Sequence, residues 1–320
     1  MAKPLVFLTR SLPDAVMKEL KDRFQLRSNP HDRPLSKKEI LKGIRNADGL
    51  ISMLSDPIDR EVIDAGKKLK IIANYAVGYN NIDIQAAAER KIAVTNTPGV
   101  LTETTADLTF GLLLAAARRL SEAEQLLRSG KWTGWAPTQL LGTDLYGKTI
   151  GIIGMGRIGQ AVARRAAGFS MRTLYHSRHP LSPTAEKSLS ITFLPFSHLL
   201  RESDFITLHL PLTGESRHLI GQKALHAMKP TAFLINTSRG PIVDEPALIR
   251  ALAEKRIAGA GLDVFEKEPR VPRRLSRMKN VVLLPHIGSA STETRVRMGM
   301  MVLENLSALF AGQEPPNMVN

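Results

Sequence analysis

The chain has 320 residues, which is enough for two domains with separate hydrophobic cores. It contains no cysteine, so disulfides, thiolate metal sites and a cysteine nucleophile are excluded. A chain without disulfides fits the reducing cytoplasm. The formal net charge is +14, but the basic residues are dispersed and only 5% of the residues are aromatic, so no nucleic-acid partner is expected. The apolar runs are too short for a signal sequence or a membrane span, which predicts a cytoplasmic protein with no membrane partner.

Short apolar runs alternate with amphipathic stretches over the first hundred residues, a pattern that predicts a parallel sheet covered by helices. The expected strands are Leu5–Thr9, Gly49–Met53, Ile71–Asn74 and Ile92–Thr95. The expected helices lie near Asp14–Lys21, Lys37–Ile44, Ile58–Ala65 and Ile84–Glu89. The turn-forming sequence from Asn96 to Gly99 interrupts the alternation, and a long helix capped by Thr102 is expected to continue to about Leu127. The first crossing between domains is therefore expected here.

The stretch from Thr149 to Gln160 reads TIGIIGMGRIGQ and predicts a strand, a tight turn and a helix. Its glycines have GxGxxG spacing, in which the first permits the turn, the second lets the backbone approach a pyrophosphate, and the third allows the helix to pack on the strand. The N-terminal amides of the helix would then face the phosphates. The stretch therefore predicts dinucleotide binding by Gly154, Met155, Gly156, Arg157, Ile158 and Gly159.

Strands and helices alternate again after this turn, so the simplest account of the chain is two doubly wound parallel sheets. The expected strands lie near Arg172–His176, Phe205–Leu210, Ala232–Asn236, Ala260–Val264 and Val281–Leu284. A final helix is expected from Thr292 to Phe310, followed by a short terminal tail from Gly312 to Asn320.

The end of the second strand of this dinucleotide-binding unit bears on the choice of cofactor, because an acidic residue there binds the ribose hydroxyls of NAD. This chain has Ser177 and Arg178 instead. A serine and an arginine suit a 2′-phosphate, which needs a hydrogen-bond donor and a cation. The sequence thus favours NADP(H), with NAD(H) as the second choice. The alternative is that Arg178 belongs to a solvated basic loop.

Reduction of a keto group needs a proton donor near the carbonyl oxygen and a cation for the substrate carboxylate. Candidates follow three of the later strands, at the edge of the sheet where ligands bind. His286 is the best acid/base candidate among eight histidines, Glu268 could orient it, and Arg239 could hold a carboxylate through two hydrogen bonds. Each residue also has a structural interpretation. His286 could be a structural histidine, Glu268 could be a solvated glutamate as Glu266 could be, and Arg239 could form a structural ion pair. No metal site is expected.

Several motifs in one order resemble the D-isomer-specific 2-hydroxyacid dehydrogenases, and within them the glyoxylate/hydroxypyruvate reductases. The resemblance covers essentially the whole chain, and its motifs are Tyr75–Asp83, the Gly154 turn, Asn236–Gly240, Gly261–Pro269 and Leu284–Ala290. It implies a flavodoxin-like substrate domain, residues 1–99 and 289–320, and a Rossmann-type dinucleotide-binding domain, residues 100–288, with a cleft between them. It also implies a homodimer formed through the cofactor domain.

The resemblance also assigns roles to residues of this chain. It implies His286 as the proton donor, Glu268 as its partner and Arg239 as the residue that binds and polarises the 2-keto acid. The substrate carboxylate is expected on the backbone amides of Val77 and Gly78. The substrate pocket is expected to include Leu54 and Ser55, and the further expected cofactor contacts are Thr104, Leu210, Pro211, Thr237, Ser238, Asp263 and Gly288.

We therefore expect an NADPH-dependent enzyme that reduces glyoxylate or hydroxypyruvate, with His286 protonating the product oxygen. Two alternatives remain: a family member that acts on another 2-keto acid or on phosphite, and a protein of the same fold that senses dinucleotides without turnover. Trp132 and Trp135 match the reductase subgroup, although such aromatic residues could equally pack against a partner domain or subunit.

Overall fold

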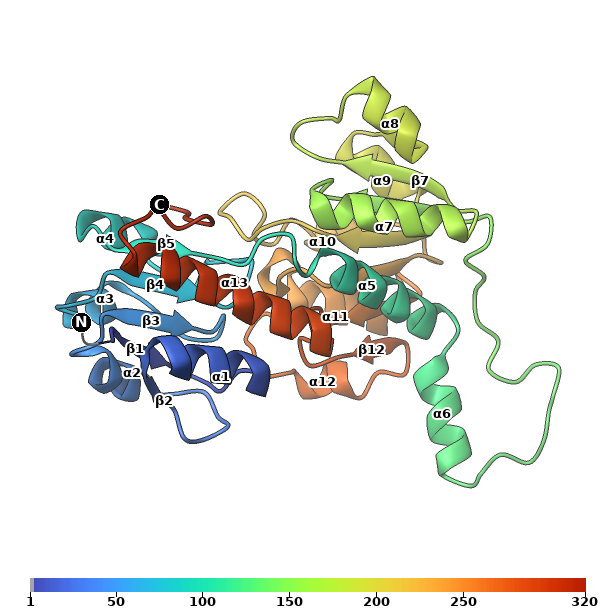
Figure 1. Cartoon of the computed structure of the whole chain (residues 1–320). Helices are drawn as coiled ribbons and strands as arrows, with labels where there is room; N and C mark the ends of the chain where they lie inside the picture. The colour runs from blue at the N-terminus through green and yellow to red at the C-terminus, as the bar shows by residue number, and fades with distance from the viewer. Residues whose placement is uncertain (1–2) are drawn as a thin grey trace. The chain divides into compact units, whose positions relative to one another are not determined.

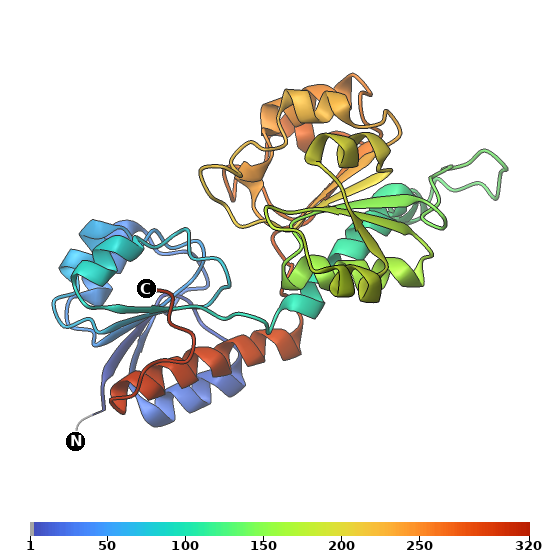
Figure 2. The same cartoon turned by 90° about the horizontal axis from the view of Figure 1, so that it is seen from above.

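The computed structural model describes residues 3–320, whose contacts divide the chain into two units (Figure 1). The first unit contains the residues up to Leu101 together with Ser289–Asn320, and the second contains Thr102–Gly288. Each unit has one parallel sheet with helices against both of its faces (Figure 2). The prediction of two doubly wound α/β folds is therefore confirmed.

The first unit is built on a five-stranded, fully parallel sheet. Its strands are β1 (Leu5–Leu8), β2 (Gln25–Ser28), β3 (Gly49–Ser52), β4 (Ile71–Asn74) and β5 (Ala93–Thr95), and its helices are α1 (Asp14–Arg23), α2 (Lys37–Ile44), α3 (Arg60–Ala65), α4 (Ile84–Glu89) and α13 (Thr292–Phe310). The strand order β2-β1-β3-β4-β5 is the flavodoxin-like order, in which ligands bind outside the carboxyl ends of the strands.

Alternate side chains of each strand pack on opposite faces of this sheet. Val6 and Leu8 pack with residues of α1 and α13, whereas Phe7 packs with residues of α2 and α3. All three side chains are buried. Because both faces are covered, the strands read as continuous apolar runs in the sequence, which is why they were predictable.

The last residues of the chain cover the free edge of β5. The Asn317 carbonyl accepts a hydrogen bond from the Asn96 amide (3.2 Å), and the Val319 amide donates to the Val94 carbonyl (2.8 Å). The Asn320 side chain accepts from the Val94 amide (2.8 Å). The expected terminal tail is therefore an ordered segment that satisfies the backbone groups of an edge strand.

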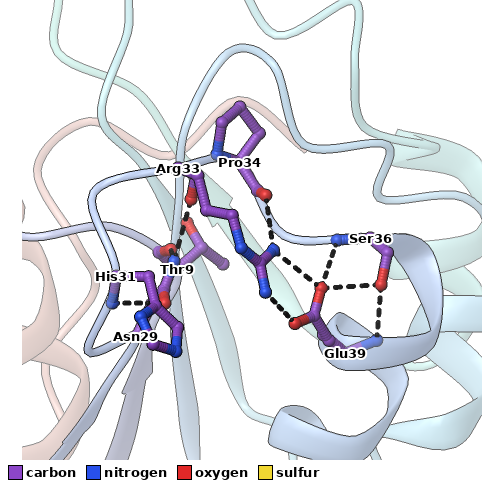
Figure 3. Close-up of polar contacts among 7 residues, drawn as sticks. All are labelled: Thr9, Asn29, His31, Arg33, Pro34, Ser36 and Glu39. Carbon is purple, nitrogen blue, oxygen red and sulfur yellow. Dashed lines mark hydrogen bonds and ion pairs between the residues drawn. The ribbon is translucent and has the colours of Figure 1, made fainter.

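The loop that joins β2 to α2 is fixed by side chains at both ends (Figure 3). The Asn29 amide group donates to the carbonyls of Thr9 (3.0 Å) and Arg33 (2.9 Å). At the other end Ser36 and Glu39 form a capping box that begins α2, and the Arg33 guanidinium donates to both Glu39 oxygens (3.1 and 2.5 Å). The Arg33 hydrogen bond, followed by those of Ser36, holds the pKa of Glu39 below its ordinary value.

The second unit is built on a seven-stranded parallel sheet. Its strands are β6 (Thr149–Ile153), β7 (Arg172–His176), β8 (Ile191–Phe193), β9 (Phe205–Leu208), β10 (Phe233–Asn236), β11 (Gly259–Leu262) and β12 (Val281–Leu283). Its helices are α5 (Thr102–Ala117), α6 (Leu120–Arg128), α7 (Arg157–Gly168), α8 (Pro183–Leu189), α9 (Phe196–Glu202), α10 (Gln222–Ala227), α11 (Glu245–Ala253) and α12 (Arg273–Ser276), with a 3-10 turn at Gly240–Ile242.

The strand order β12-β11-β10-β9-β6-β7-β8 is that of a dinucleotide-binding sheet extended by one strand, with its switch point between β6 and β9. On one face Ile152 and Ile235 pack with apolar residues of α5 and α7. On the other face Ile206 and Leu234 pack with residues of α9, α10 and α11. The sheet is thus buried on both sides, and its strand ends are the exposed places where functional residues can gather.

Three sequence expectations need correction. The strands β2 and β8 were not predicted, because both are short edge strands with partly exposed residues. The single helix from Thr102 to about Leu127 is wrong: α5 ends at Ala117, Arg119 has a φ of +55°, and α6 is a separate helix. Thr102 is the first residue of α5 and not its cap. Within residues 3–320, no helix is long and apolar enough to cross a membrane.

Candidate active site

The glycine turn lies between β6 and α7, at the switch point of the second sheet. Gly154 has a φ of +99°, and a Cβ there would lie 2.6 Å from the His209 carbonyl oxygen. A Cβ on Gly159 would lie 2.1 Å from the Gly154 carbonyl oxygen. The turn itself therefore requires glycine at both positions.

The middle glycine, Gly156, borders open space. Within residues 3–320, a Cβ built there meets no atom within 4 Å, and no side chain caps the N-terminus of α7. A pyrophosphate can approach the backbone at this point and accept hydrogen bonds from the first amides of a helix of 12 residues. The geometry therefore fits a dinucleotide, whose phosphates would be held by residues 154–159.

Ser177 and Arg178 follow β7, as the sequence predicted for the ribose end of a dinucleotide site. The Ser177 hydroxyl donates to the His179 carbonyl (2.5 Å). The Arg178 guanidinium lies 3.4 Å from Glu215, and both side chains are more than 70% exposed. An ion pair this exposed is weak because water screens it, so Arg178 can exchange Glu215 for a phosphate. Glu215 was not identified from the sequence.

The structure brings His286 and Glu268 together. The distance from His286 Nδ1 to Glu268 Oε2 is 2.8 Å, and the side chains are 24% and 30% exposed. The second oxygen of Glu268 accepts a hydrogen bond from the Phe265 amide (3.0 Å). Burial raises the pKa of Glu268, but the hydrogen bond and charge of His286, with Arg239, hold it below its ordinary value. The ionised carboxylate therefore fixes Nδ1 of the ring, which leaves Nε2 for a ligand.

Asp263 holds the segment that carries His286. This aspartate is fully buried after β11, and its two oxygens accept the amides of Ile287 (2.7 Å) and Gly288 (2.8 Å). The Thr105 hydroxyl donates to the Gly288 carbonyl (3.0 Å). Burial raises the pKa of Asp263, against the opposing effects of the Ile287 hydrogen bond and the His286 charge. These contacts stabilise the left-handed backbone of His286, which has a φ of +55°.

Arg239 follows β10 in a turn that is held by Asn236. The Asn236 amide group donates to the Arg239 carbonyl (2.9 Å), and its oxygen accepts from the Ser238 amide (3.0 Å) and hydroxyl (2.9 Å). The Arg239 guanidinium donates to the Ser238 carbonyl (2.7 Å). Burial lowers the pKa of Arg239, while the nearby Glu268 charge raises it. Arginine nevertheless stays protonated in proteins, so a cation lies close to the Glu268–His286 pair.

Gly240 allows two functional segments to touch. A Cβ on Gly240 would lie 1.9 Å from the carbonyl carbon and oxygen of Phe265 and 2.5 Å from the Glu266 amide nitrogen. Only glycine therefore lets the segment that carries Arg239 lie against the segment that carries Glu268.

Other histidines of this unit have different surroundings. Burial lowers the pKa of His209 to about 3, so its ring is neutral at pH 7 and is unsuited to donate a proton. His218 Nε2 lies 3.0 Å from Glu266 Oε1, a pairing that sequence reasoning missed. His286 pairs with Glu268, a carboxylate that also feels the charge of Arg239.

The other residues expected to contact the cofactor lie at the ends of strands or at the start of a helix. Leu210 and Pro211 follow β9, and Leu210 borders the glycine turn. Thr237 follows β10, and its hydroxyl lies 2.9 Å from that of Thr109 in α5. Thr104 lies in the first turn of α5. Their contact with a dinucleotide stays a prediction.

In the first unit, the segment after β4 offers two backbone amides. The Asn96 side chain donates to the Val77 carbonyl (2.8 Å), and the Asn74 side chain donates to the Gly78 carbonyl (2.9 Å). Among residues 3–320, neither the Val77 amide nor the Gly78 amide has a hydrogen-bond acceptor. Tethered carbonyls and available amides form a place where an anion such as a carboxylate can bind. Sequence reasoning did not identify the two asparagines, although Asn74 is the last residue of the apolar strand β4 and Asn96 directly follows β5.

Leu54 and Ser55 lie in the loop after β3, which is held by Asp56. One Asp56 oxygen accepts the Thr9 hydroxyl (2.5 Å) and the Met53 amide (2.8 Å). Burial raises the pKa of Asp56 in spite of these hydrogen bonds. Ser55 lines a surface hollow of about 450 Å³ that is bordered by the starts of α3 and α4.

Similar proteins are known for the whole chain. Residues 110–288 match the NAD binding domain of the D-isomer specific 2-hydroxyacid dehydrogenases. The glyoxylate reductase of Korarchaeum cryptofilum is 54% identical over 320 residues, which cover 99% of this chain and 96% of that protein. A protein of known structure from Thermus thermophilus is 48% identical, with a TM-score of 0.92 and coverage of 99% of this chain and 100% of that one.

A further solved structure contains ligands. The NADPH-dependent glyoxylate/hydroxypyruvate reductase from Sinorhizobium meliloti, in complex with NADP and malonate, is 37% identical to this chain. Its TM-score is 0.87, and the match covers 99% of this chain and 97% of that one.

Proposed function

Because this chain belongs to the D-isomer-specific 2-hydroxyacid dehydrogenases, we propose that it reduces glyoxylate or hydroxypyruvate to the 2-hydroxy acid with NADPH. The observation that carries the proposal is the 2.8 Å contact between His286 and Glu268, with the Arg239 charge close to Glu268. The names of the similar proteins support the substrate class. The dinucleotide-binding domain is the second unit, and the first unit supplies substrate contacts.

The proposed roles follow from the chemistry of the three side chains. Bound NADPH would supply a hydride to the carbonyl carbon. His286 transfers the proton on Nε2 to the carbonyl oxygen and becomes neutral, while Glu268 stabilises the protonated ring before the transfer. Arg239 holds the substrate carboxylate and polarises the carbonyl bond through its planar pair of donors. The product is the neutral alcohol group of a 2-hydroxy acid.

The first unit would supply the other substrate contacts. The amides of Val77 and Gly78 would receive the substrate carboxylate, since their carbonyls are tethered by asparagines and the amides themselves have no acceptor within residues 3–320. Leu54 and Ser55 would limit the size of the substrate.

The proposed preference for NADPH rests on Ser177 and Arg178. No acidic residue stands where NAD-binding units place one, directly after β7. Arg178 is exposed and only weakly paired, so a 2′-phosphate would gain a charge-assisted hydrogen bond there. NADH lacks this phosphate and would gain nothing from Arg178.

The test of the catalytic proposal is the turnover of His286→Ala with NADPH and glyoxylate. We expect kcat to fall by about 10²- to 10⁴-fold, because the proton donor is lost, while NADPH binding measured by fluorescence is retained. His226→Ala is the matched control, since the His226 side chain is exposed and, within residues 3–320, its ring bonds only to the Gln222 carbonyl of its own helix. Near-normal kcat in His286→Ala would refute the assignment of the proton donor.

We also propose a homodimer that forms through the α6 arm, which we define as residues 120–146. This arm stands out from the body of the second unit (Figure 1). It carries six exposed large apolar side chains, Leu120, Leu127, Trp132, Trp135, Leu141 and Tyr146. Exposed apolar surface of this extent is typical of a protein interface. A second copy of the chain is the partner that the family resemblance implies.

The oligomeric state tests the arm. We expect light scattering to give twice the chain mass for the wild-type protein and the mass of one chain for a Leu127→Glu/Trp135→Glu variant. Met318→Glu is the control, because Met318 is exposed but lies outside the arm. A variant that stays dimeric would refute this interface.

A further inference from the structure

The backbone around the Phe265–Glu266 peptide contacts three segments, which carry Glu268, Arg239 and Glu245. The Phe265 N–H, in the peptide just before, donates to Glu268, and a Cβ on Gly240 would meet the Phe265 carbonyl and the Glu266 amide nitrogen. The position of this peptide therefore affects both Glu268 and Arg239. The Glu245 side chain accepts a hydrogen bond from the Glu266 amide of this peptide, and the His218 ring contacts the Glu266 side chain.

Glu245 is the first residue of α11, where an acidic residue usually faces water and the helix dipole. Here it is only 9% exposed. Its Oε2 accepts a hydrogen bond from the Glu266 amide (3.3 Å), the one hydrogen bond found for this carboxyl within residues 3–320. The start of α11 is fixed by Asp244, whose side chain accepts from the Ala247 amide (2.9 Å). Asp244 thus fixes the backbone at the start of α11, from which the Glu245 side chain reaches the Glu266 amide.

The surroundings of Glu245 act in opposite directions on its ionisation. Burial raises its pKa, and the Glu266 charge adds to this effect, while the Glu266 amide and the Lys267 charge oppose it. His218 Nε2 lies 3.0 Å from Oε1 of the Glu266 side chain. The His218 segment is itself fixed, because its amide donates to the Pro241 carbonyl (2.8 Å). A buried carboxyl with an electrostatic cost suggests a role beyond stability.

We propose that Glu245 is a positioning residue for keto-acid reduction: by accepting the Glu266 amide it fixes the segment that carries Glu268, and thereby the orientation of His286. This inference rests on the proposed role of His286 and Glu268 as the acid/base pair. Glu245 touches neither group directly and acts through the Phe265–Glu266 peptide. Loss of the acceptor lets this peptide move, which displaces the Glu268 oxygen that orients the ring.

Two substitutions of Glu245 separate the hydrogen bond from the charge. Glu245→Gln and Glu245→Met both remove the charge at the start of α11 and have similar volumes, but only glutamine keeps an oxygen that can accept the Glu266 amide. We expect Glu245→Met to lower kcat by about tenfold, because misplacement of a catalytic group slows the chemical step. We expect Glu245→Gln to stay within about twofold of the wild type, since its acceptor is retained.

Three measurements accompany kcat for each variant. The KM for NADPH should stay unchanged in both, because the glycine turn and Arg178 lie in other segments. Amide hydrogen exchange of residues 265–268 should accelerate in Glu245→Met and not in Glu245→Gln. Thermal unfolding midpoints show whether either variant is less stable than the wild type. If lower stability alone caused the loss of kcat, assays at a lower temperature would remove the difference between Glu245→Met and Glu245→Gln.

The outcomes separate this inference from the proposed function. Equal kcat values for Glu245→Met and Glu245→Gln, in an enzyme that loses turnover in Glu268→Gln, would overturn the positioning role alone. Normal turnover of Glu268→Gln would overturn the acid/base pair and the inference with it. A slow Glu245→Met enzyme, rescued by glutamine and accompanied by faster exchange at 265–268, supports the inference.

Discussion

Replacement of Gly240 by alanine should damage catalysis far more than its size suggests. The new Cβ would lie 1.9 Å from the Phe265 carbonyl atoms, which is about 1.5 Å short of the ordinary van der Waals contact that begins near 3.4 Å. Because backbone lies on both sides, the segments that carry Arg239 and Glu268 must separate by a comparable distance. A displacement of about 1 Å at reacting groups can reduce the rate by about 100-fold, and overpacking should destabilise the fold by about 1–3 kcal/mol.

Steady-state oxidation of NADPH by glyoxylate measures the effect on kcat, and urea unfolding measures the effect on stability. Gly111→Ala is the matched control: Gly111 lies inside α5, and a Cβ built there meets no atom of residues 3–320 within 4 Å outside the backbone of its own helix and its chain neighbours. That control should leave kcat unchanged and stabilise the helix by up to about 1 kcal/mol. A Gly240→Ala enzyme that folds and turns over at the rate of Gly111→Ala would refute the reasoning that glycine sets the distance between the two catalytic segments.

Three further outcomes are expected. Arg239→Lys should raise the KM for glyoxylate and lower kcat, because a point charge cannot reproduce two parallel hydrogen bonds, and unchanged kinetics would count against its role. Arg178→Ala should lower kcat/KM with NADPH by about tenfold and leave the value with NADH unchanged, whereas equal losses would argue against a 2′-phosphate contact. Arg33→Met should destabilise the protein in urea at pH 7. The pKa of Glu39 is held below its ordinary value of 4.5, so this stabilisation is present above pH 4.5 and declines as the pH falls toward the folded-state pKa; a pH-independent difference between the two proteins would contradict it.

The parallel sheets were predictable because their strands are buried on both faces and therefore appear as continuous apolar runs. The edge strand β2, with the sequence QLRS, has no such run and was missed. The break between α5 and α6 also has no local signal, since the residues around it are good helix formers. It arises from a tertiary contact: the Thr143 amide donates to the Ala117 carbonyl (2.8 Å), and Gly142 lies against the same oxygen.

The neighbourhood of His286 and Glu268 could be anticipated from the motifs, because the ends of adjacent parallel strands lie at one edge of the sheet. The residues that hold them could not. Asp263, Asn236 and Glu245 act through hydrogen bonds to backbone amides and carbonyls, and a sequence shows the side chain but not the backbone group that it reaches. The same reason explains why Asn74 and Asn96, which tether the segment of Val77 and Gly78, were not identified.

The most direct test of the proposed function is the initial rate of NADPH or NADH oxidation by the purified protein with glyoxylate, hydroxypyruvate and pyruvate. The account predicts fast oxidation of NADPH with glyoxylate or hydroxypyruvate, and a lower kcat/KM with NADH for the same substrate. Dinucleotide binding without turnover of any of these substrates would contradict the proposed reduction, and a higher kcat/KM with NADH would contradict the role of Ser177 and Arg178.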